Sequence, residues 1–197
     1  MTQASHTIMP TIRNRFHAFM LSVLLLTGIL VTPNGANANE QQWGHWRGPT
    51  GNGESLTATP PKEFGPDKNC RWKQPIPGRG SSSPVVWDDQ VFITTAIPVS
   101  DGRGTLDFRL LCYDRKTGTK QWDHSCIKAV PYEGTHSTNG YASASPCTNG
   151  RYVYAHFGSQ GLYCLTMDGK PVWDKDFGDM HTRNEFGEGS SPTLVDD

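Results

Sequence analysis

Short apolar runs separated by polar turn residues make up most of the chain after residue 80. Between residues 145 and 177, four runs read SPCT, RYVYAHF, LYCLTM and KPVWDKDF, separated by Asn-Gly at 149–150, GSQG at 158–161 and Asp-Gly at 168–169. Asn-Gly and Asp-Gly are strong hairpin signals because both central residues of a type I′ turn need positive φ. RYVYAHF alternates Val153, Ala155 and Phe157 on one face with tyrosine and histidine on the other, which is the period of a strand. The pattern predicts four short antiparallel strands.

An earlier stretch shows the same order of runs: SPVVW, QVFITTAI, FRLLCYD and TKQWDHS. It differs by a polar insertion, Pro98 to Asp107, between its second and third runs. Trp72, Trp122 and Trp173 recur at separations of 50 and 51 residues. A four-stranded antiparallel unit repeated at about this period is typical of propeller blades. The expected fold class is therefore all-β, an incomplete β-propeller of four-stranded antiparallel blades.

The repeat also predicts how the chain is divided. The chain stops at SSPTLVDD, which matches the start of a blade, so we expect an N-terminal fragment of a longer protein. The expected parts are a signal peptide (1–38), an N-terminal arm with a lead-in strand around Trp72 (39–80), blade 1 (81–130), blade 2 (131–180) and the truncated start of blade 3 (181–197).

The segment DRKTGTKQW, residues 114–122, ends one predicted strand, turns at Thr117-Gly118 and reaches a tryptophan on the outer strand. In the second copy the turn shortens to Asp168-Gly169 while the tryptophan is retained. A tryptophan that survives a change of turn indicates packing between blades more than chemistry, since its large flat side chain can fill the wedge between neighbouring sheets. The predicted blade-docking residues are Trp72, Trp122, Trp173, Gly118 and Gly169.

The first residues have the pattern of a secretory signal peptide. Arg13 and Arg15 precede an apolar run at 19–31, and Ala-Asn-Ala at 36–38 is a small-x-small cleavage site. The run is shorter than the roughly 20 residues of a membrane span. We expect export to the periplasm or the outside, with membrane contact only through the signal peptide. Translation starting at Met9 is an alternative to Met1.

Charge and cysteines exclude some functions. A formal net charge of −1 offers no basic face, so no nucleic-acid partner is expected. Five cysteines leave at least one unpaired, and no CxxC occurs. Cys112 and Cys164 fall in matching repeat positions, which suggests buried strand residues. We expect no structural disulfide and no metal site, since His136, His156 and His181 stand in dissimilar contexts.

The sequence CYDRKTGTKQW resembles the repeat of the pyrroloquinoline-quinone-type (quinoprotein-like) β-propellers. Asp114, Thr117, Gly118 and Trp122 match that repeat, whereas Thr166 replaces the aspartate in the second copy. The segments WGHWRGPTGNG, WKQPIPGRGSSSPVVW, TNGYASASP and TRNEFGEGSSP resemble exported propeller proteins of planctomycete-type bacteria. The resemblance covers the chain from Trp43 onward and implies seven or eight blades in the parent protein.

The resemblance implies two main functions. One class of relative is the propeller lipoprotein that assists outer-membrane β-barrel assembly, which suggests a non-catalytic exported scaffold without a cofactor. The alternative is the N-terminal part of a pyrroloquinoline-quinone-dependent dehydrogenase, which would need the quinone and calcium. The adjacent cysteines common in such enzymes are missing here. No catalytic residue is predicted, and a non-functional remnant is a third possibility.

Two polar segments, 135–146 and 181–192, each precede the innermost strand of a blade and are expected to line the axial funnel. They suggest a rim for a protein partner or a small polar ligand. The alternative is that these segments only tie the blades together through hydrogen bonds. The candidate ligand residues are His136, Asn139, Tyr141, Arg183, Asn184, Glu185 and Glu188.

Overall fold

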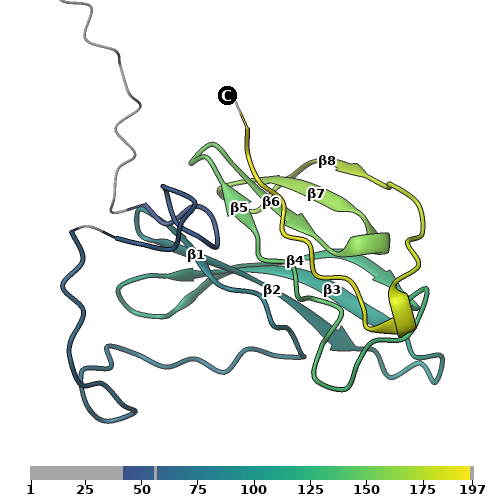
Figure 1. The fold of residues 1–197 in the computed structure, drawn as a ribbon, viewed down its shortest axis with the longest axis horizontal. Helices are drawn as coiled ribbons and strands as arrows, with labels where there is room; N and C mark the ends of the chain where they lie inside the picture. Colours follow the sequence, from purple (N-terminus) through teal and green to yellow (C-terminus); the bar gives the residue numbers. More distant parts are fainter. Residues whose placement is uncertain (1–41, 56, 196–197) are drawn as a thin grey trace, which may run out of the picture. The chain divides into compact units, whose positions relative to one another are not determined.

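Two antiparallel β-sheets of four strands each form the body of the computed structural model, which describes residues 42–55 and 57–195 (Figure 1). The chain divides into units 1–35 and 36–197, and every described residue belongs to the second. The predicted signal peptide lies outside the described residues. The all-β class and the two four-stranded blades are confirmed.

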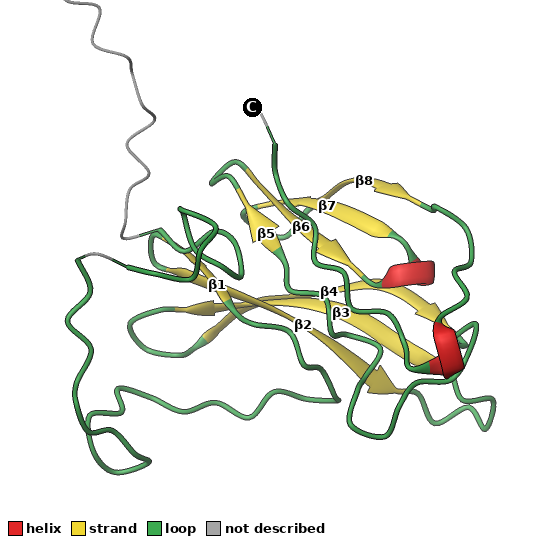
Figure 2. Cartoon of the chain, in the orientation of Figure 1, coloured by secondary structure: helices red, strands yellow, loops and turns green. Residues whose placement is uncertain are grey.

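Both sheets are meanders in which each strand pairs with the next one along the chain (Figure 2). Two short 3₁₀ helices accompany them, η1 (Gly158–Gln160) and η2 (Arg183–Glu185). The strands of the first sheet, blade 1, are β1 (Val85–Trp87), β2 (Gln90–Pro98), β3 (Leu106–Asp114) and β4 (Lys120–Ala129). Those of the second, blade 2, are β5 (Cys147–Thr148), β6 (Tyr152–His156), β7 (Leu162–Thr166) and β8 (Pro171–Lys175).

The two ends of the polar insertion at 98–107 belong to strands in the structure. β2 runs to Pro98 and pairs there with Leu106, the first residue of β3, so only residues 99–105 form the connecting loop. The ends of the insertion therefore lengthen two strands of blade 1, and its middle forms the loop between them. This happens because Ile97 pairs with Asp107 in register, which lets the backbone continue its ladder of hydrogen bonds.

The core lies between the two sheets. Phe92 and Leu110 of blade 1 are fully buried against Val153 and Ala155 of blade 2. The period-two alternation of RYVYAHF explains this, since alternate residues of one strand point to the same face. Burial of such side chains contributes about 1.5–3 kcal/mol each. The core thus fixes the two blades face to face, with the inner strands β1 and β5 in contact.

Two tryptophans sit on glycine turns in the same way. The Trp122 indole N–H donates to the Met167 carbonyl at 3.0 Å, and a Cβ atom on Gly169 would lie 2.7 Å from the indole. The Trp72 indole N–H donates to the Arg115 carbonyl at 2.8 Å, and a Cβ atom on Gly118 would lie 2.6 Å from the ring. Both glycines have positive φ, so these turns need glycine for conformation and for space.

Two segments expected to begin or continue strands form none in the structure. Residues 71–77 around Trp72 have no strand assignment, although Pro77 accepts a 2.5 Å hydrogen bond from Thr95. Among residues 181–195 the structure assigns only η2. A strand needs a neighbour to take its backbone hydrogen bonds, and these segments lack a complete partner strand along their described length.

Candidate functional site

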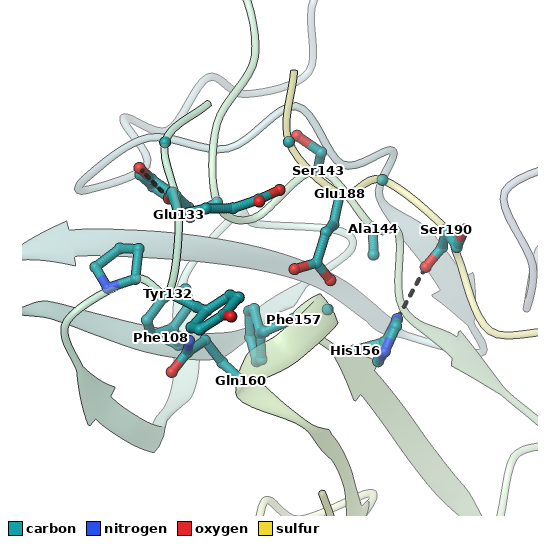
Figure 3. Close-up of a pocket in the computed structure, with 16 residues that line it drawn as sticks. Phe108, Tyr132, Glu133, Ser143, Ala144, His156, Phe157, Gln160, Glu188 and Ser190 are labelled. Atoms are coloured by element: carbon teal, nitrogen blue, oxygen red, sulfur yellow. Dashed lines mark hydrogen bonds between the residues drawn. The ribbon is translucent and has the colours of Figure 1, made fainter. Parts of the chain in front are cut away.

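Three loop segments meet in a small hollow at one end of the sheets (Figure 3). They are the β4–β5 connection, the β6–β7 connection with η1, and the segment that follows η2. The enclosed space is about 30 Å³, enough for about two water-sized groups. The lining residues are Phe108, Pro131, Tyr132, Glu133, Gly134, Tyr141, Ser143, Ala144, His156, Phe157, Gly158, Gln160, Gly187, Glu188, Gly189 and Ser190.

Aromatic rings form one wall of the hollow. Phe108 from blade 1 and Phe157 from blade 2 meet edge to face, with ring centroids 5.4 Å apart. The Tyr141 hydroxyl donates to the Glu133 carbonyl at 3.1 Å, which fixes that ring in the β4–β5 connection. Edge-to-face aromatic pairs add about 0.5–1.5 kcal/mol beyond their area. This wall therefore belongs to the packed interface between the blades and is rigid.

Glu188 is held against η1. Its carboxylate accepts hydrogen bonds from the Ser159 backbone N–H at 2.7 Å and from the Ser159 hydroxyl at 2.6 Å. It lies directly over Gly158, where a Cβ atom would collide with the carboxylate. Gly158 also has φ +60, so glycine is required there twice over. Each carboxylate oxygen keeps a lone pair that can accept a further hydrogen bond.

Glu133 is the second carboxylate of the hollow. It accepts hydrogen bonds from the backbone N–H of Thr182, at 2.8 Å, and from the Thr182 hydroxyl. Its other oxygen lies 3.4 Å from Nδ1 of His181. The hydrogen bonds from Thr182 lower the pKa of Glu133, so this carboxyl is ionised at neutral pH.

His156 has one defined hydrogen bond. Its Nδ1 lies 3.0 Å from the Ser190 carbonyl, drawn as a dashed line in Figure 3. A carbonyl only accepts, so Nδ1 carries the proton and donates. In the neutral ring Nε2 is then the acceptor atom. His156 thus links β6 to the segment after η2 and defines one side of the hollow.

The seven candidate ligand residues separate into two groups. Tyr141 and Glu188 line the hollow, whereas the other five do not. Asn139 donates to the Phe186 carbonyl at 2.9 Å, and the His136 ring meets Phe186 edge to face at 5.4 Å. These contacts hold two connections together, as in the alternative interpretation of these segments.

The remaining three candidates lie in η2. Asn184 and Glu185 have φ +54 and +52, and Arg183 is exposed. A Cβ atom on Gly134 would lie 3.0 Å from the Glu185 carboxylate, so Glu185 contacts the β4–β5 connection. Their geometry positions the η2 turn beside the hollow without bringing their side chains into its lining.

Sequence reasoning missed Glu133, His156, Phe157 and Gln160, which also line the hollow. The signal was present in the strand order. In an antiparallel four-stranded blade, the turn between the second and third strands lies at the same end as the connection to the next blade. The β6–β7 turn therefore had to face the β4–β5 connection.

The described residues contain no group of three or more histidine, cysteine, aspartate or glutamate side chains arranged to hold a metal ion. All five cysteines are unpaired, and burial raises the pKa of Cys112, Cys126 and Cys147 to about 12. Such thiols stay protonated at neutral pH and are poor nucleophiles. Among the residues with described positions, no helix is long and apolar enough to cross a membrane.

Comparison with known proteins identifies the family. No curated protein matches significantly. Among solved structures, the crystal structure of BamB from Moraxella catarrhalis aligns with 15% identity and a TM-score of 0.32. That alignment covers 58% of this chain and 37% of the other, so the chain spans well under half of that relative. The family of the outer membrane protein assembly factor BamB, with its quinoprotein-type repeat, matches residues 36–197, and the chain belongs to this family.

Proposed function

We propose that the chain is an exported, non-catalytic propeller scaffold that binds a protein partner at the hollow between its blade connections and serves protein assembly in the cell envelope. Family membership supports the assembly role, because the family carries the name of an outer membrane protein assembly factor. The observation that carries the binding role is the hollow itself, with two ionisable carboxyl groups and aromatic walls.

The rim of the hollow is preorganised. Glu133 joins the β4–β5 connection to Thr182, and Asn139 joins the same connection to Phe186. Glu188 then fixes the following segment to Ser159. A partner would meet loops that are already ordered, which lowers the entropy cost of binding.

The chemistry of the lining favours a cationic group. Glu133 and Glu188 contribute carboxyl groups, and no lysine or arginine lines the hollow. Tyrosine and phenylalanine faces attract a cation that lies within about 6 Å. The small enclosed space suits a single ammonium or guanidinium head better than a whole sugar or ring system. A basic side chain on an exposed protein segment has this chemistry.

This binding role can be tested by capture of envelope proteins on the purified chain. We expect Glu188→Gln and Glu133→Gln to weaken capture of the main bound protein by roughly three- to tenfold, and high salt to do the same. Glu63→Gln is the matched control, because Glu63 is an exposed carboxylate in the N-terminal arm, away from the hollow, and pairs with the exposed Lys68. Equal capture by all three variants would contradict the proposal.

The enzymatic alternative needs pyrroloquinoline quinone and calcium, and the residues that line the hollow do not fit that pair. The hollow encloses about 30 Å³, whereas pockets for ligands of this size enclose about 300 Å³ or more. The two carboxylates that line it are engaged by Ser159 and Thr182 and belong to no metal-binding group of described residues. A dye-linked dehydrogenase assay with added quinone and calcium separates the two functions, since activity would establish the enzyme.

Export is part of the same proposal and rests on the N-terminal pattern. Expression of the full chain in a Gram-negative host should deliver a product that begins at Asn39, directly after the Ala-Asn-Ala site, or within a few residues of it. Mass spectrometry of the periplasmic fraction measures this directly. Full-length protein confined to the cytoplasm would contradict export and with it the proposed role in the cell envelope.

A further inference from the structure

A groove lies at the edge of the two sheets, between the last strand of blade 1 and the last strands of blade 2. One side of this edge groove carries Ile127 and Val130, at the end of β4 and in the connection after it. The other side carries Asp174, Asp176 and Asp179, near the end of β8 and in the segment after it. The groove holds about 420 Å³, a volume within the range of ligand sites.

Strand register explains why these side chains meet. Ile127 stands opposite Phe108 across β4 and β3, so both point to the face on which the Phe108 ring meets Phe157 of blade 2. Asp174 stands opposite Tyr163 across β8 and β7, and the centroid of the Tyr163 ring lies 6.1 Å from that of Phe157. Asp174 and Ile127 therefore belong to the two sheet faces that look toward each other.

The edge groove has an excess of negative charge. Among the described residues of its lining, Lys175 alone is basic, and strand alternation turns that side chain to the face of β8 opposite Asp174. Asp176 accepts the backbone N–H of Gly178 at 2.8 Å. Within residues 42–55 and 57–195, Asp174 and Asp179 form no ion pair and no side-chain hydrogen bond. Two carboxylates are therefore available to a cation.

The field of these carboxylates reaches Tyr163, which also lines the groove. The Tyr163 hydroxyl donates to the Gln160 carbonyl at 2.7 Å. Burial, and to a smaller extent the negative charges of Asp174 and Asp176, raise the pKa of Tyr163 to about 12. An added negative charge is unfavourable there for the same reasons, so the groove disfavours an anionic ligand and favours a cationic one.

The side of the groove that belongs to blade 1 is apolar and uncovered. Val130 is 54% exposed, and Tyr132, which also lines the groove, is 46% exposed. Lysine and arginine side chains lay their aliphatic stems along such a surface while the charged head reaches a polar partner. A stem that lies along Val130 can direct its head to the opposite side, where Asp174 and Asp179 are. The groove therefore suits a basic side chain of a protein better than an inorganic cation.

The segment that follows β8 is held in place beside the groove. The Met180 backbone N–H donates to the Ser159 hydroxyl on the β6–β7 connection at 2.8 Å. The Tyr132 hydroxyl lies 3.1 Å from Nε2 of His181, which ties the β4–β5 connection to the same segment. A partner would therefore meet a groove whose sides are already positioned, and it would lose less entropy on binding.

The edge groove adjoins the hollow. Tyr132 and Gln160 line both of them, and both side chains are labelled in Figure 3. The hollow carries Glu133 and Glu188, and the groove carries its three aspartates, so acidic side chains lie in both spaces. One extended segment can therefore pass over Tyr132 with a basic side chain in each space.

We propose that the edge groove is the second subsite for the protein partner, filled by a lysine or arginine of the same extended segment that places a basic side chain in the hollow. This second subsite rests on the proposed function of the hollow, and it adds the chemistry of the partner: two basic residues a few positions apart. Asp174 and Asp179 bind the charged head, and Ile127 and Val130 contact the stem.

Lysine peptides test the two subsites together. The first peptide has a single lysine in a neutral glycine–serine background, and the others have two lysines separated by one, three or five spacer residues, which span about 7 to 20 Å when extended. Each peptide carries a neutral fluorophore, and its binding to the full chain is measured by fluorescence anisotropy at low salt. We expect the best two-lysine peptide to bind at least about tenfold more tightly than the single-lysine peptide.

Aspartate variants assign this gain to the groove. Asp174→Asn and Asp179→Asn should each weaken binding of the best two-lysine peptide by roughly threefold, and together they should remove the tenfold gain. The matched control is Asp67→Asn, because Asp67 is an exposed aspartate of the N-terminal arm that lines neither the groove nor the hollow. Glu188→Gln should weaken binding of both kinds of peptide, since both use the hollow.

Four outcomes overturn the proposal. Equal binding of the one- and two-lysine peptides, still weakened by Glu188→Gln, removes the second subsite and leaves the proposed function of the hollow standing. A gain that Asp67→Asn lowers as much as the groove variants do assigns the effect to net charge alone. Spermidine that binds as tightly as the best peptide assigns the groove to a free polyamine. Peptide binding that is insensitive to Glu188→Gln contradicts the proposed function of the hollow, and the shared segment with it.

Discussion

The glycine turns of the two blades carry the same tryptophan contact on different local chemistry. In blade 1 the Asp114 carboxylate accepts the backbone N–H groups of Lys116 and Thr117, at 2.9 and 2.7 Å. In blade 2 the shorter turn is closed by the Thr166 hydroxyl, which accepts the N–H of Lys170 at 3.1 Å. The two turns share a glycine and a carbonyl for the indole. The aspartate is therefore one of two ways to build a turn, and the tryptophan–glycine pair is what joins the blades.

The largest expected effect comes from removing Trp122, which is partly buried against the core. Trp122→Ala deletes an indole that packs on Phe92 and donates to Met167, and it should lower the free energy of unfolding by about 4 kcal/mol. Urea denaturation followed by far-UV circular dichroism measures this. Loss of less than about 1 kcal/mol would mean that the contact does not hold the blades.

Replacing Gly169, the glycine under Trp122, should lower the free energy of unfolding somewhat less. Gly169→Val adds a Cβ atom 2.7 Å from the indole at φ +83, so the turn must shift or Trp122 must leave its place. We expect a loss of about 3 kcal/mol in the same urea experiment. Gly51 has a similar φ of +70, but nothing lies near its Cβ position. Gly51→Val therefore introduces backbone strain without a steric collision and serves as the control. An equal loss in both variants would assign the whole effect to backbone strain.

A smaller effect is expected at the turn of blade 1 as the pH falls. Backbone and hydroxyl hydrogen bonds from Thr117 lower the pKa of Asp114. A lowered folded-state pKa stabilises the fold above the unfolded value of about 3.9, and this stabilisation is lost as pH falls through the folded value. Asp114→Asn should therefore narrow the difference between melting temperatures at pH 5 and pH 2.5. A variant with an unchanged difference would show that Asp114 contributes nothing to the acid sensitivity of the fold.

The smallest change is expected at the exposed counterpart. Trp173→Ala removes a side chain that is 40% exposed and lacks a docking turn among the described residues, so the unfolding free energy should fall by about 1 kcal/mol or less. The comparison with Trp122→Ala uses the same residue type at the same repeat position. Equal destabilisation by both variants would mean that the contact of Trp122 with the Met167–Gly169 turn adds nothing to stability.

Local signals were enough to predict most strands. The hairpins at 149–150 and 168–169 depend on residues next to each other in sequence, and the alternation in RYVYAHF depends only on strand geometry. The segment around Trp72 was predicted as a strand on the evidence of its tryptophan alone. Its position depends on contacts with Arg115 and Gly118, more than forty residues away, which no local pattern contains.

The hollow was harder to predict for the same reason. Tyr141 and Glu188 were identified because both lie in polar segments that precede inner strands. Glu133 and Phe157 reach the hollow only because the packing of the two sheets brings three separate connections together. The polarity of a loop shows that it can bind a ligand. Which loops share a site is decided by how the blades pack.

The most direct test of the tryptophan–glycine contacts is hydrogen exchange of the indole N–H protons in the unmodified chain, followed by NMR. The Trp72 and Trp122 protons, which donate at 2.8 and 3.0 Å to turn carbonyls, should exchange at least about tenfold more slowly than that of Trp173. Assignments come from single tryptophan-to-phenylalanine variants. Exchange of the Trp122 proton as fast as that of Trp173 would contradict the claim that tryptophan–glycine contacts join the blades.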